Sequence, residues 1–88
     1  MADIEKAKIA MMIAASKALD YSKVNPKAES EEIFQHIMKE IPATGFAKAA
    51  AIAAVDKALR YKERENLKER EILQRIMNEA DAIISNVG

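Results

Sequence analysis

The sequence contains no cysteine and no tryptophan, and it has only two glycines and two prolines in 88 residues. Without cysteine the chain has no disulfide framework, no thiolate metal site and no cysteine nucleophile. With two glycines it offers few positions for the left-handed turns that an all-β fold of this length requires. These absences favour a helical fold.

The chain also has no excess of positive or negative charge, because 14 basic and 14 acidic side chains give a formal net charge of zero. This balance removes the strongest argument for nucleic acid or an anionic membrane as partner. The apolar runs at residues 9–15 and 49–55 are far shorter than the about 20 residues of a membrane-spanning helix. Acidic residues near the first run argue against a signal peptide, so we expect a cytoplasmic protein without membrane contact.

What the chain does contain is an internal repeat. Identical residues recur at a shift of 40 from Ala7, Lys8, Ala10, Ala14, Lys17, Ala18, Leu19 and Tyr21. They recur at a shift of 39 from Glu32, Ile33, Gln35, Ile37, Met38 and Glu40. The repeat predicts a single domain, residues 1–88, built from two copies of one helical hairpin, approximately residues 4–41 and 44–85.

Each copy has the start and stop residues of two helices. The expected helices cover about residues 3–23, 30–41, 45–64 and 66–85. Their expected N-caps are Asp3, Ser30, Thr44 and Asn66, the last in a capping box with Glu69. The chain is therefore predicted to be all-α, a four-helix bundle of two duplicated hairpins with pseudo-twofold symmetry.

The first and third helices differ from the other two, because their middles are apolar nearly all the way round. Such helices must be covered on every side, so they form the central pair or meet another subunit. A stripe of alanines on each would let the two axes approach closely. We expect the bulkier neighbouring stripes, which contain Leu19 and Leu59, to pack on the second helix of the same hairpin.

The two copies differ at three apolar positions of the first helix. Ile9, Met11 and Ile13 correspond to alanines at 49, 51 and 53. One interpretation is that large side chains of one copy pack against small ones of the other, as in a filled core. The alternative is an exposed apolar patch that meets a partner. The three residues are the candidate interface.

His36 is the only histidine, and Glu32 lies one turn before it on the same helix face, a spacing that could ligate a metal. The matching pair in the second copy is Glu71 with Arg75, and an arginine cannot ligate. The serines have no nucleophile-elbow context, and no glycine-rich loop is present to hold phosphate. We expect no metal, no cofactor and no enzymatic activity.

Two further groups of residues suggest ligands. Lys17, Tyr21, Lys57 and Tyr61 form a candidate anion or metabolite site if the pseudo-twofold brings them together. The candidate nucleic-acid contacts are Arg60, Lys62, Arg64, Lys68, Arg70 and Arg75. Acidic residues interleaved with the second group are more typical of a solvated helix face.

The pattern as a whole predicts a non-enzymatic protein–protein interaction or assembly module that associates with a protein partner or with itself as a homodimer. Nucleic-acid binding and small-anion binding are the alternatives.

Overall fold

The computed structural model describes residues 2–41 and 45–87, and within them the chain folds into helices with no strand. The elements are α1 (Ala2–Val24), α2 (Ser30–Glu40), α3 (Gly45–Arg60), the π-helical turn η1 (Tyr61–Glu65) and α4 (Glu69–Val87). The predicted all-α fold is confirmed.

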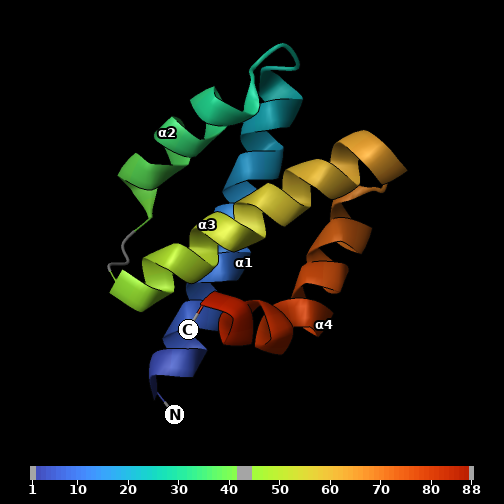
Figure 1. Ribbon diagram of the computed structural model, residues 1–88. Helices are drawn as coiled ribbons and strands as arrows, with labels where there is room; N and C mark the ends of the chain where they lie inside the picture. The colour runs from blue at the N-terminus through green and yellow to red at the C-terminus, as the bar shows by residue number, and fades with distance from the viewer. Residues whose placement is uncertain (1, 42–44, 88) are drawn as a thin grey trace.

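The alanine-rich helices α1 and α3 lie at the centre and make the most extensive contact between any two elements. The outer helices α2 and α4 each contact both central helices, and within the described residues they do not contact each other. Figure 1 shows α2 on one side of the crossed central pair and α4 on the other. Each outer helix therefore lies over a groove formed by α1 and α3 together.

The buried side chains form two clusters, one under each outer helix. The α4 core consists of Ala7, Met11, Ala15, Leu19, Ala50, Ala54, Ala58, Ile72, Ile76, Ala80, Ile83 and Ile84. The α2 core consists of Ala10, Ala14, Ala18, Ile33, Ile37, Ile41, Ala51, Val55 and Leu59. Alanines on both central helices make close packing possible, and the residues that the outer helices contribute are mainly isoleucines.

The prediction for the bulkier stripes is wrong. Leu19 of α1 lies in the α4 core, and Leu59 of α3 lies in the α2 core, so each leucine packs on the outer helix of the other hairpin. Within its own hairpin α2 packs on the alanine side of α1, through Ala14 and Ala18. Small side chains allow an outer helix to lie close to its own central helix, and the opposite central helix fills the remaining space.

Three of the predicted N-caps, Asp3, Ser30 and Asn66, are also wrong, and Thr44 lies outside the described residues. The helix α1 begins at Ala2, so Asp3 is already helical. In α2 the N-cap is Glu29, whose carbonyl accepts a hydrogen bond from the Ile33 amide at 3.1 Å, and it makes no side-chain cap bond. Ser30 is therefore the first helical residue of α2.

Asn66 ends a helix instead of opening one. The α-helical geometry of α3 changes after Arg60 into the π-helical turn η1, and Asn66 follows with a φ of 51°. Asparagine tolerates this left-handed conformation better than most residues. The capping box with Glu69 is not formed, because α4 begins only at Glu69.

Candidate functional site

The three residues of the candidate interface separate in the structure. Met11 is fully buried in the α4 core, whereas Ile9 is 59% exposed and Ile13 is 38% exposed. Packing of large against small side chains therefore accounts for Met11 only. On α1 the two isoleucines are four residues apart and form one outward stripe, with Lys6 and Asp20 exposed on the same face.

A shallow apolar groove lies beside this stripe, between α1 and α4. It is lined by Met12 of α1 and by Leu73 and Met77 of α4, with polar side chains of α4 around them. Met77 is 57% exposed. Sequence reasoning missed this groove, because Leu73 and Met77 share the apolar face of α4 with residues that are buried.

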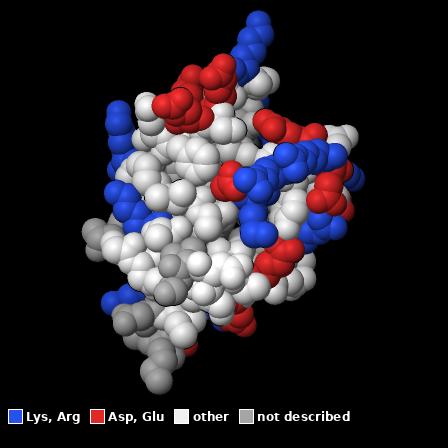
Figure 2. Space-filling view, in the orientation of Figure 1, with Lys and Arg blue, Asp and Glu red and all other residues white. Residues whose placement is uncertain are grey.

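The corresponding face of α3 also carries exposed apolar side chains. Ile52 and Phe46 are each 38% exposed, and Ala49, the counterpart of Ile9, is exposed as well. Figure 2 shows a broad area without charged side chains in the middle of the face on which α3 lies in front. At the position of Ile9, however, α3 presents only a methyl group.

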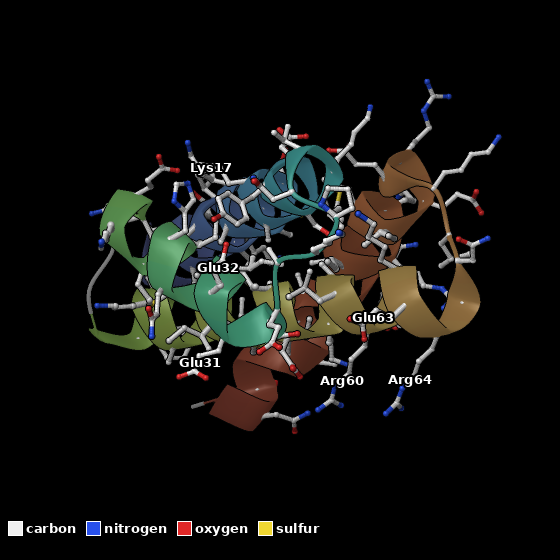
Figure 3. All side chains as sticks on the ribbon, turned by 90° about the horizontal axis from the view of Figure 1, so that it is seen from above. Lys17, Glu31, Glu32, Arg60, Glu63 and Arg64 are labelled. Carbon is white, nitrogen blue, oxygen red and sulfur yellow. The ribbon has the colours of Figure 1, made fainter. Side chains whose placement is uncertain are left out.

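The four residues of the candidate anion site are not brought together. Lys17 and Tyr21 face α2, where Lys17 Nζ lies 3.5 Å from Glu40 and the Tyr21 hydroxyl donates to Glu32 at 2.7 Å. Figure 3 shows Lys17 and Glu32 on the side of the molecule that carries α2. Both groups already have a carboxylate partner.

The second pair faces α4 on the other side of the central helices. Lys57 Nζ lies 3.9 Å from Glu79 Oε1, and the Tyr61 hydroxyl donates to the same oxygen at 2.5 Å. Partial burial and this hydrogen bond raise the pKa of Tyr61 to about 12. The hydrogen bond to Glu32 likewise raises the pKa of Tyr21. Each pair thus ties a central helix to the outer helix of its own hairpin.

His36 contributes to the contact between α1 and α2 through its aromatic ring. Its ring stacks on Tyr21 with the centroids 4.3 Å apart. The repeat counterpart Arg75 lies over the Tyr61 ring at 5.0 Å and donates to both carboxylate oxygens of Glu65 at 2.8 Å. In the part of the chain that the structure describes, no group of three or more His, Cys, Asp or Glu side chains could hold a metal ion.

The basic residues proposed for nucleic-acid contact have acidic or polar neighbours. Arg60 Nε lies 3.1 Å from Asp56, and Lys62 donates to Ser22 at 2.9 Å. Arg60 and Arg64 point away from the body on one side in Figure 3. Lys68 and Arg70 are exposed at the start of α4. On the face that Figure 2 shows, blue and red groups are interleaved on the side where η1 and the start of α4 lie.

A partly open surface hollow lies between the end of α1, the start of α2 and η1. Ser22, Lys23, Ser30 and Lys62 line a cavity there, above the apolar side chains of Ile33 and Leu59. Ser22 and Lys62 occupy equivalent positions in the two copies of the repeat. This equivalence is the sequence signal from which the hydrogen bond between them could have been predicted. Nearby, the pKa of Glu69 is raised by partial burial and by a hydrogen bond with Asp20, and the charges of Lys23 and Lys62 offset only part of this rise.

No protein-family model, curated protein or solved structure matches the chain. Among residues 2–41 and 45–87, no helix is both long and apolar enough to cross a bilayer.

Proposed function

We propose that this chain is a non-enzymatic assembly module and that the outward face of α1 makes the contact. The observation that carries the proposal is the exposure of Ile9 and Ile13, 59% and 38%, on one face of a central helix. Fully burying an isoleucine side chain is worth about 1.5–3 kcal/mol. Because the exposed parts of Ile9 and Ile13 together amount to about one whole side chain, a partner that covers both gains about 1.5–3 kcal/mol of association free energy.

The partner in this proposal is a second copy of the chain. With a formal net charge of zero, two copies have no net repulsion to overcome on approach. Most soluble oligomers are formed by identical chains, and twofold dimers are the commonest kind.

We also infer that the bundle is a duplicated hairpin with pseudo-twofold symmetry. Ion pairs at matched repeat positions support this: Lys17 with Glu40 in the first copy corresponds to Lys57 with Glu79 in the second. The two cores support it as well, because exchanging the copies converts Leu19 of the α4 core into Leu59 of the α2 core. The exposed isoleucines interrupt this correspondence, as expected if one copy acquired a binding role.

The test is the native mass by light scattering over a series of concentrations, with the monomer at 9.8 kDa. We expect the mass to approach twice that value and Ile13→Glu to return it to that of the monomer. The matched control is Ile52→Glu on α3, since Ile52 has the same 38% exposure as Ile13.

Circular dichroism establishes that both variants are folded. A wild-type mass near 9.8 kDa at every concentration would contradict the proposal, as would equal losses from the two substitutions.

A further inference from the structure

One face of the molecule holds a ridge and a groove side by side. The ridge consists of Ile9 and Ile13 on α1, and the groove is formed by Met12 of α1 with Leu73 and Met77 of α4. Met12 lies one helical turn after Ile9, so the two features share α1 and form one apolar surface. A surface with both shapes can be complementary to a copy of itself.

The charges at the ends of this surface are also complementary. The ridge is flanked on α1 by exposed Lys6 and exposed Asp20. On α4 the groove is flanked by exposed Arg70 and by Asp81. A basic and an acidic residue therefore flank each of the two features.

The relative direction of α1 and α4 determines which of these charges share an end. Lys8 of α1 pairs with Asp81 of α4 at 2.9 Å, and Asp20 lies beside Glu69 at the opposite end. The two helices thus run in opposite directions, as Figure 1 shows. Asp81 of the groove lies at the Lys6 end of the ridge, and Arg70, which follows Glu69, lies at the Asp20 end.

We propose that two copies of the chain pair through this face, with the ridge of each copy in the groove of the other, about a twofold axis parallel to α1. This arrangement rests on the proposed function and specifies its geometry. It covers Ile9, Ile13 and Met77 together. At one end Lys6 meets Asp81 of the second copy, and at the other end Asp20 meets Arg70 of the second copy.

A twofold axis perpendicular to α1 would place ridge on ridge instead. The two stripes of isoleucine would then meet, but the groove would stay open and Met77 would remain exposed. Interfaces pack their centres to the density of a protein interior, which favours insertion of the ridge into the groove.

Disulfide cross-linking tests the arrangement directly, because the chain has no cysteine of its own. Ile13→Cys protein and Met77→Cys protein are mixed in equal amounts under mild oxidation and separated by non-reducing electrophoresis. We expect the mixture to give at least fivefold more covalent dimer than either variant alone. Ile52→Cys mixed with Met77→Cys is the matched control and gives only background.

The outcomes separate this inference from the proposed function. If Ile13→Cys alone cross-links as well as the mixture does, the ridge meets the ridge; this geometry is then wrong while self-association stands. If the wild-type chain is a monomer at all concentrations, self-association itself fails.

A charge exchange gives a second measurement that needs no cysteine. We expect Arg70→Glu to raise the dimer dissociation constant at least threefold, and Arg70→Glu combined with Asp20→Lys to recover most of that loss; the Lys6–Asp81 end is left unchanged because Asp81 also pairs with Lys8 of its own chain. A double variant that binds no better than the single one would overturn the charge pairing.

Discussion

Replacing Leu19 by alanine tests the exchanged packing of the two hairpins most directly. Leu19 is 3% exposed and lies among Ile72 and Ile76 of the α4 core. Truncating a leucine in such a site costs on the order of 3 kcal/mol, the lost transfer free energy plus the cavity. A chain of 88 residues has a total stability of roughly 4–13 kcal/mol, so the loss is large.

Which of the two cores Leu19→Ala perturbs is more informative than the size of the stability loss. With the isoleucine methyl groups labelled for NMR, Leu19→Ala should shift the signals of Ile72 and Ile76 and leave those of Ile33 and Ile37 nearly unchanged. The matched variant Leu59→Ala should do the reverse, because Leu59 lies in the α2 core. Urea denaturation gives the free energy of unfolding for both.

The reasoning would be refuted if Leu19→Ala shifted the α2 signals more than the α4 signals. That result would mean that each leucine packs within its own hairpin, as expected from the sequence for the bulkier stripes.

Three further predictions concern single positions. Because Asn66 has a left-handed φ of 51°, Asn66→Gly should raise the free energy of unfolding by up to about 1 kcal/mol and Asn66→Ala should lower it by about as much. The urea midpoints of both variants are compared with that of wild type, and an alanine variant more stable than wild type would contradict the prediction. Burial and the hydrogen bond to Glu79 raise the pKa of Tyr61 to about 12, above that of an unfolded tyrosine, so its stabilising contribution is complete below about pH 10 and is lost as the pH rises toward 12. Between pH 9 and 11 the free energy of unfolding measured in urea should fall more steeply for wild type than for Tyr61→Phe. Parallel curves would contradict this assignment. Ala54→Leu should lower the stability of the fold by about 1–3 kcal/mol, because it overpacks the fully buried centre. Ala49→Leu, at an exposed position of the same helix, should change the thermal stability little. Similar losses of stability in the two variants would contradict the central packing.

The sequence predicted the helical elements because hydrophobic periodicity and repetition are local properties. The break at Asn25 and Pro26 follows from the restriction that proline places on its neighbour, and α1 ends just before it, at Val24. The central position of α1 and α3 follows from the need to cover helices that are apolar all round.

The tertiary partners could not be predicted in the same way. Whether Leu19 packs on α2 or α4 depends on how α1 and α3 cross, and no residue pattern within one helix determines that angle. The separation of Met11 from Ile9 and Ile13, by contrast, could have been predicted from the sequence, because residues two apart on a helix point to opposite sides.

The predicted caps failed for a local reason. Serine and asparagine both favour turns and helix starts, and composition does not tell which of these uses applies. Asn66 meets the left-handed requirement at the end of η1, and this excludes it from opening α4.

The exchanged packing makes the two halves of the chain mutually dependent. A fragment ending at Ile41 would keep α1 and α2 but lose Val55 and Leu59, which complete the core over α2. A fragment beginning at Gly45 would lack Leu19 and Met11 in the same way. Neither piece can bury its own isoleucines, so the divided chain should regain its fold only by fragment complementation, when both pieces are present in one solution.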